Sequence, residues 1–163
     1  MTDQEKRKGG GAKLSRSETV TVRLDPRLRY LGEIAARAQR RTLSSYIEWA
    51  LKQAIDVESI RPTATPSLTA TDQTVGGEGD YLWDVDECDR LVNLADRYPH
   101  LLTYEEQRLW KVIRESVFMW QDGAGGSTAL FLLHREKLRR NWQLLVSLAA
   151  DGKSGADLDC EMV

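Results

Sequence analysis

Three polar side chains alternate with apolar ones along the stretch "SETVTVRLDPRL", residues 17–28. Thr19, Thr21 and Arg23 would share one face of an extended segment, because successive side chains of a strand point to opposite sides. An arginine can donate two hydrogen bonds to a guanine edge, and a threonine can bond a base edge or touch a thymine methyl group. The spacing therefore predicts a strand over about residues 18–24 whose polar face has the chemistry to contact bases.

The apolar face of this predicted strand needs a partner. Val20, Val22 and Leu24 lie on that face. A strand must also pair its backbone N–H and C=O groups, yet we find no second convincing strand in the sequence. The two helices that follow total only about 30 residues, below the size at which a chain usually folds unaided. Two copies would meet both needs by pairing strand with strand across a two-fold axis, so we expect an obligate dimer.

Two helix starts follow the strand. Asp25 and Pro26 fit an N-cap followed by proline at the first helical position, and apolar residues then recur at helical spacing to about Gln39. Thr42 is the N-cap candidate of a second helix that reaches about Val57. The residues expected to form the dimer core are Val20, Val22, Leu24, Leu31, Ile34, Ile47 and Leu51.

This order of elements resembles the ribbon–helix–helix repressor family over about residues 18–57, a third of the chain. In that family two strands from two chains form an antiparallel ribbon that contacts bases in the DNA major groove. The resemblance implies base contacts by Thr19, Thr21 and Arg23. It also implies phosphate contacts at the start of the second helix, where unpaired N–H groups and the helix dipole favour an anion. The candidates there are Thr42, Ser44 and Ser45, with Arg40 and Arg41 beside them.

The turn between the two helices departs from the family pattern. That turn commonly carries glycine, whereas this chain has "AQRRTLSS" with Arg40 and Arg41. A residue other than glycine with a positive φ angle costs about 1 kcal/mol. Either Arg40 adopts that conformation or the turn has another shape.

The charge is distributed unevenly along the chain. Residues 1–57 hold 12 Lys/Arg against 7 Asp/Glu, a net charge of +5, whereas residues 58–163 hold 11 against 18, a net charge of −7. A basic first part suits a nucleic acid, and an acidic second part suggests a different partner. Residues 1–17 are expected to form a flexible basic arm that could contact the DNA backbone or minor groove.

The remainder of the chain is predicted to be helical. Residues 58–80 are rich in Pro, Thr, Ser and Gly and are interpreted as a linker. Residues 81–150 predict a three-helix module, with helices over about 85–97, 103–121 and 128–150, and Gly152 falls where a C-terminal cap is expected. Residues 151–163 are expected to be a loose acidic tail. The fold class is thus mostly α. The expected core tryptophans of the module are Trp83, Trp110, Trp120 and Trp142.

The sequence gives no positive sign of an enzyme, a cofactor or a metal site. Cys88, His100, His134 and Cys160 show no ligand spacing, and "GAGGST" lacks the lysine of a phosphate-binding loop. The longest apolar run, "ALFLL", is far short of the roughly 20 residues of a membrane span, and the N-terminus has no secretory pattern. Two cysteines make no disulfide framework. We therefore expect a cytoplasmic protein.

The resemblance implies a homodimeric, sequence-specific double-stranded DNA-binding protein, a transcriptional repressor of bacterial or mobile-element type. Two alternatives stay open. One is an antitoxin whose C-terminal part binds a toxin, and the other is an accessory factor for plasmid transfer or partition. In each case residues 81–150 are expected to serve assembly or bind a protein partner.

Overall fold

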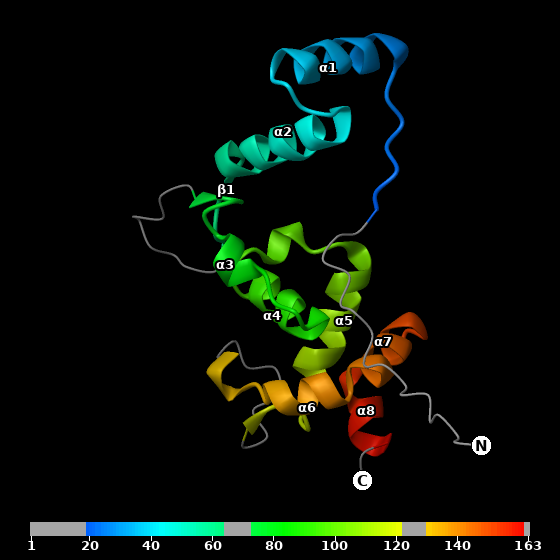
Figure 1. Ribbon diagram of the computed structural model, residues 1–163. Helices are drawn as coiled ribbons and strands as arrows, with labels where there is room; N and C mark the ends of the chain where they lie inside the picture. Colours follow the sequence, from blue (N-terminus) through cyan, green and yellow to red (C-terminus); the bar gives the residue numbers. More distant parts are fainter. Residues whose placement is uncertain (1–18, 64–72, 122–129, 162–163) are drawn as a thin grey trace, which may run out of the picture. The chain divides into compact units, whose positions relative to one another are not determined.

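The computed structural model describes residues 19–63, 73–121 and 130–161 (Figure 1). These residues are mostly helical, with one small antiparallel sheet of two strands. The chain divides into two compact units, Met1–Ile47 and Glu48–Val163. The boundary falls within helix α2 (Leu43–Val57). The predicted basic arm, residues 1–17, lies outside the described residues.

The first helix, α1 (Pro26–Ala38), begins as the sequence predicts. The Asp25 carboxylate accepts hydrogen bonds from the backbone N–H groups of Arg27 at 2.9 Å and Leu28 at 3.1 Å, and Pro26 is the first helical residue. Residues 19–25 precede α1 as extended chain that pairs with no strand among the described residues. Pairing of this segment with a second chain, as in a ribbon–helix–helix dimer, is therefore a proposal.

The α1–α2 turn has the shape that usually calls for glycine, with arginine in its place. Arg40 has a φ of 55°. The Arg41 N–H donates to the carbonyl of Ala36 at 2.9 Å, and the Arg40 N–H donates to the carbonyl of Arg37 at 3.0 Å. These two bonds define the left-handed helix ending known as a Schellman motif. Of the two possibilities left open by the sequence, Arg40 adopts the positive φ.

Helix α2 begins at the predicted cap. The Thr42 hydroxyl accepts a hydrogen bond from the N–H of Ser45 at 3.2 Å. At its other end, the Ile55 carbonyl accepts from the N–H of Gly76 at 3.0 Å. Between Ile55 and Gly76 in the sequence, strands β1 (Ser59–Ile60) and β2 (Gln73–Thr74) pair, with Ser59 opposite Thr74.

The predicted linker, residues 58–80, is therefore structured where it is described. Besides β1 and β2, it contains the first residues of α3 (Gly79–Leu82). A Cβ atom at Gly76 would collide with the side chain of Asp56, so this glycine permits a close backbone approach to the end of α2. The Thr74 hydroxyl accepts from the N–H of Gly77 at 3.0 Å. The described glycine and threonine residues therefore form a tight turn against the end of α2 and do not act as a flexible linker.

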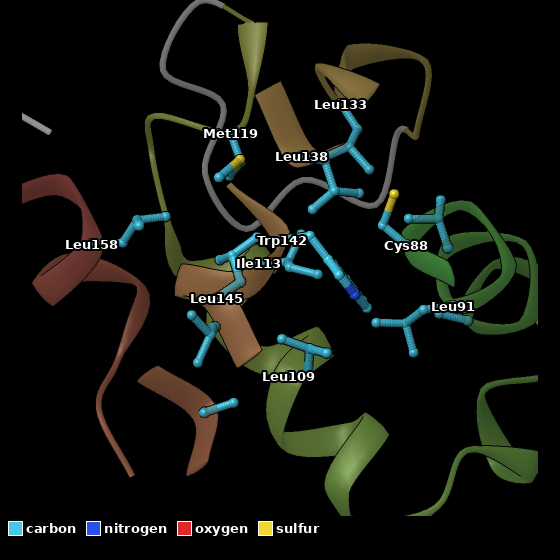
Figure 2. Packing of buried hydrophobic residues seen from close by; sticks show 14 of the residues in the cluster. Cys88, Leu91, Leu109, Ile113, Met119, Leu133, Leu138, Trp142, Leu145 and Leu158 are labelled. Atoms are coloured by element: carbon cyan, nitrogen blue, oxygen red, sulfur yellow. The ribbon is translucent and has the colours of Figure 1, made fainter. Parts of the chain in front are cut away.

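The helical module has a closed apolar core, shown in Figure 2. Its remaining helices are α4 (Glu87–Arg97), η1 (Pro99–Leu101), α5 (Tyr104–Glu115), η3 (Leu130–Leu132), α6 (Arg135–Arg140), α7 (Trp142–Ala150) and α8 (Gly155–Glu161). Ile113, Leu138, Leu145 and Leu158 have no exposed surface. The predicted capping box at Thr103 and Glu106 starts α5.

The predicted core tryptophans divide into two groups. Trp120 and Trp142 are buried, as predicted, and Trp110 packs partly buried against the core. Trp83 does not belong to the core, because 68% of it is exposed. It follows directly after α3, where the Arg90 guanidinium lies 5.0 Å from its ring centroid.

The two long helices expected over residues 103–121 and 128–150 are both interrupted. Trp120 forms an isolated antiparallel bridge with Leu133, and the N–H of His134 donates to the carbonyl of Met119 at 2.9 Å. This short pairing of extended residues takes the place of helix in both predicted segments. The Trp120 indole N–H also donates to the Ile113 carbonyl at 2.9 Å. The apolar residues that predicted two long helices instead lie on shorter helices, which pack against one another.

The tail expected to be loose is ordered where it is described, over residues 151–161. Gly152 has a φ of 75° and ends α7, as predicted, with the N–H of Lys153 donating to the carbonyl of Leu148 at 3.0 Å. Helix α8 follows, and its Leu158 enters the core. The Asp159 carboxylate accepts from the Ser116 hydroxyl at 2.6 Å and from two backbone N–H groups, those of Val117 at 2.9 Å and Phe118 at 3.0 Å.

Candidate nucleic-acid interface

The three predicted base-contacting residues lie on an accessible segment. Thr19, Thr21 and Arg23 are exposed in the extended chain before α1. No ion pair joins Arg23 to any other residue that the structure describes. Their polar groups are therefore available to a partner. Among the described residues of one chain, the segment itself pairs with no strand.

The apolar residues assigned to a dimer core are left uncovered by the neighbouring residues that the structure describes. All seven are exposed, from 36% for Leu24 to 78% for Val20. Helix α2 has no buried residue along its whole length, and Ala36 is the one buried residue of α1. Folded helices with an uncovered apolar face are expected where the covering surface belongs to another molecule.

The five predicted phosphate contacts gather at one turn. Arg40, Arg41 and Thr42 connect α1 to α2, and Ser44 and Ser45 lie in the first turn of α2. All five are exposed. The Thr42 hydroxyl accepts from Ser45, so its own proton remains able to donate. The first turn of α2 contains no acidic residue, so no side-chain carboxylate offsets the positive end of the helix dipole there.

Acidic side chains on α1 are already matched by basic ones. The Glu33 carboxylate lies 3.2 Å from the Arg29 guanidinium and 3.6 Å from that of Arg37. The described part of this region, residues 19–57, holds seven Lys/Arg against four Asp/Glu. The excess positive charge therefore sits largely on residues that are candidates for DNA contact.

A cluster that the sequence analysis missed lies in the helical module. Carboxylate oxygens of Asp84, Asp86 and Asp89 lie within 4.8 Å of one another. The buried Asp89 carboxylate accepts from the guanidiniums of Arg135 and Arg139, each at 2.6 Å. Burial raises the pKa of Asp89, but these two hydrogen bonds outweigh burial and leave the pKa lowered. The two arginines thus hold Asp89 and Asp86 in an ion-pair network, in which the Arg139 guanidinium also lies 3.1 Å from the Asp86 carboxylate. The motif "DVDECD" was its only sequence signal.

Three further groups, Cys88, Tyr81 and Tyr98, are buried or half-buried and have raised pKa values. Burial raises the pKa of the Cys88 thiol to about 11, so it stays protonated at neutral pH. Burial also raises the pKa values of Tyr81 and Tyr98 to about 12. Both tyrosines lie near Arg97, whose guanidinium is 2.8 Å from the Glu78 carboxylate. This network joins the end of α4 to the start of α3.

Comparisons with known proteins add no relative. No protein-family model, curated protein or solved structure matches the chain. Among the residues that the structure describes, every helix is too short or too polar to cross a membrane.

Proposed function

We propose that this chain is a homodimeric, sequence-specific double-stranded DNA-binding protein of the ribbon–helix–helix type, acting as a transcriptional repressor. The observation that carries the proposal is the exposure of the entire predicted dimer core on a segment whose two helix starts follow the sequence expectations. An apolar face of this extent on capped helices calls for a second copy of the same face.

In the proposed dimer, residues 19–24 of two chains pair as an antiparallel ribbon. Such a ribbon fits the major groove of B-DNA. The side chains of Thr19, Thr21 and Arg23 would contact base edges from one face of the ribbon, and Val20 and Val22 would enter the shared core from the other. The α1–α2 turns would hold phosphates on either side, which fixes the position of the ribbon without selecting a sequence.

Selection of binding sites from random DNA duplexes tests this proposal. We expect the intact protein to enrich a palindrome or repeat, because a two-fold dimer binds two half-sites. The Thr21→Ala/Arg23→Ala variant should lose this preference while remaining a dimer. Arg114→Ala, which removes an exposed charge on α5, serves as the matched control and should enrich the same sequence. Unchanged preference in the Thr21→Ala/Arg23→Ala variant would refute contact of bases by the ribbon.

Two further measurements separate the parts of the mechanism. Thr42→Ala should weaken binding to all sequences by a similar factor, since phosphate contacts carry no sequence information. Binding of the intact protein should also fall steeply with salt. A reporter gene with the enriched site inside its promoter should be repressed by the intact protein and not by the ribbon variant. Binding without repression would retain the DNA-binding proposal and reject the repressor role.

A further inference from the structure

Two adjoining hollows lie on the helical module, over α4, α5 and α7. The first encloses about 360 Å³ and the second about 260 Å³. Both are lined by Glu87, Glu106 and Leu109, so the two hollows adjoin at these residues. We call the pair of hollows the α4–α7 groove. All of its lining residues belong to the unit Glu48–Val163.

The floor of the groove is apolar. Leu91, Leu94 and Trp142 line the first hollow, and Val146 and Ala149 line the second. Figure 2 shows Leu91, Leu109 and Trp142 among the buried residues of the core. The groove therefore has an apolar floor, which is the kind of surface that receives the apolar face of a helix.

The edges of the groove carry an excess of negative charge, because three glutamates and two arginines line it. Glu87, Glu105 and Glu106 form no ion pair among the described residues. Glu87 accepts from the Trp142 indole N–H at 3.2 Å, and Glu106 accepts from the N–H of Thr103 at 2.7 Å. Both of these donors are uncharged, so the carboxylates keep their full charge beside the apolar floor.

The two arginines of the groove turn their guanidiniums to carbonyl groups instead. Arg90 donates to the carbonyls of Asp84 at 2.7 Å and Val85 at 3.1 Å. Arg108 donates to the carbonyls of Ala149 and Ala150 at the end of α7. These contacts place both guanidiniums at helix ends, and uncharged carbonyls leave their positive charge in place. The lining of the groove therefore has a net charge of −1, within a region, residues 58–163, of net charge −7.

Exposed aromatic side chains adjoin the groove. The Trp83 ring centroid lies 5.0 Å from the Arg90 guanidinium and the Tyr104 ring centroid 5.9 Å from that of Arg108, and both arginines line the groove. Exposure is 68% for Trp83 and 69% for Tyr104. Aromatic residues are enriched where proteins bind one another. The groove thus combines an apolar floor, acidic edges and neighbouring aromatic rings.

We propose that the α4–α7 groove binds a basic amphipathic helix of a partner protein. The apolar stripe of that helix would lie on the floor, and its Lys or Arg side chains would face Glu87, Glu105 and Glu106. A second copy of the module is a poorer occupant, because residues 58–163 carry a net charge of −7 and like charges oppose each other. This proposal does not depend on DNA binding.

The test uses the full chain and three synthetic 14-residue peptides. The first has leucines at positions i, i+3, i+4 and i+7 with lysines elsewhere. The second replaces every lysine by glutamate, and the third scrambles the first so that its leucines share no helical face. We expect saturable binding of the first peptide alone by titration calorimetry. Because the chain is proposed to dimerise through residues 19–57, sedimentation without peptide compares the intact chain with Glu105→Lys, and association lost only in the variant reports that the groove binds a second copy.

A matched pair of variants locates the binding. Glu105→Lys reverses a charge at the edge of the groove, and Glu136→Lys makes the same change outside it. Both residues are exposed, and each is the second residue of its helix, α5 and α6 respectively. We expect Glu105→Lys to weaken binding of the leucine–lysine peptide about ten-fold, and Glu136→Lys to change it less than about two-fold.

Each contrary result overturns the proposal in a distinct way. Equal weakening by the two variants would show attraction by net charge alone. Equal binding of the scrambled peptide would exclude recognition of a helix, and equal binding of the glutamate peptide would exclude the role of the acidic edges. No saturable binding of the first peptide up to about 1 mM would reject the groove as a helix site. Self-association that Glu105→Lys abolishes would assign the groove to a second copy.

Discussion

Leu31 on α1 and Leu145 on α7 are the same side chain at apolar positions of two helices, yet their surroundings differ. Half of Leu31 is exposed, whereas no part of Leu145 is. Leu145 belongs to a core made by helices of its own chain, as Figure 2 shows. Leu31 lies in a region whose described residues include a single buried side chain, Ala36, between residues 19 and 57. An apolar pattern therefore predicts burial without saying which molecule supplies the cover.

The two regions should also differ in how they lose stability. Where the cover comes from the same chain, unfolding is unimolecular and its midpoint is independent of concentration. Where a second chain supplies it, folding and association are coupled and the midpoint rises with concentration. This contrast allows one type of substitution to distinguish the two regions.

The largest effect is expected from truncating these two leucines. Leu145→Ala should lower the free energy of unfolding of the helical module by about 2–5 kcal/mol, because it opens a cavity in a closed core. Leu31→Ala should cost a similar amount if a second chain covers it, and the loss should appear as a concentration-dependent fall in melting temperature. Calorimetry over a hundred-fold range of protein concentration measures both. A cost below about 1 kcal/mol for Leu31→Ala, independent of concentration, would contradict the dimer.

Charge burial is the next point of contrast, because the described acidic residues of α1 and α2 are not fully buried whereas Asp89 in α4 is. Asp89→Asn should lower the free energy of unfolding by about 3 kcal/mol, since it leaves Arg135 and Arg139 without their shared carboxylate. Asp96→Asn, at a partly exposed carboxylate of the same helix, is the comparison variant. Urea unfolding at pH 7 measures both.

The same carboxylate should make stability depend on pH. The folded-state pKa of Asp89 is lowered from 3.8, so its ionised form stabilises the fold above that pH. The contribution is lost as the pH falls through the folded-state pKa. We expect the free energy of unfolding to fall below pH 4 more steeply in the intact protein than in Asp89→Asn. Parallel curves for the two proteins would remove Asp89 as the cause.

Much of the local structure was predictable because it depends on neighbouring residues. The caps at Asp25, Thr42 and Thr103 each need a side-chain oxygen and an N–H two or three residues later. Gly152 ends α7 because it adopts a left-handed conformation at little cost. The five phosphate candidates come together for the same reason, since all lie within six residues of the chain.

What the sequence did not predict depends on distant residues. The pairing of Trp120 with Leu133 helps to set where α5 ends and where α6 begins, and no local sequence pattern links these two residues. Helix α8 forms because Asp159 contacts Ser116, 43 residues away, and because Leu158 finds a place in the core. The Asp89 network likewise joins α4 to α6. A short, charged segment with one leucine, such as α8, gives no sign of such contacts in its sequence.

A smaller effect tests the packing of that unpredicted helix. At Gly155 a Cβ atom would overlap backbone atoms of Val112, Glu115 and Ser116, whereas at Gly79 nothing lies within 4 Å. Gly155→Ala should therefore lower the free energy of unfolding by about 1–3 kcal/mol. Gly79→Ala, the control, should raise it by up to about 1 kcal/mol by restricting the unfolded chain. A neutral Gly155→Ala would mean that α8 is not held against α5.

The smallest effect returns to the exposed region, at Arg40. Because Arg40 has a φ of 55°, Arg40→Gly should raise the free energy of unfolding of this region by about 1 kcal/mol. Arg40→Ala keeps the unfavourable conformation and should give no such gain. Both substitutions remove the guanidinium, so both should weaken DNA binding equally if Arg40 contacts phosphate. Melting and DNA titration of the three proteins separate the backbone from the side chain. A stability gain in Arg40→Gly with unchanged DNA affinity in both variants would leave the turn intact and remove Arg40 from the proposed interface.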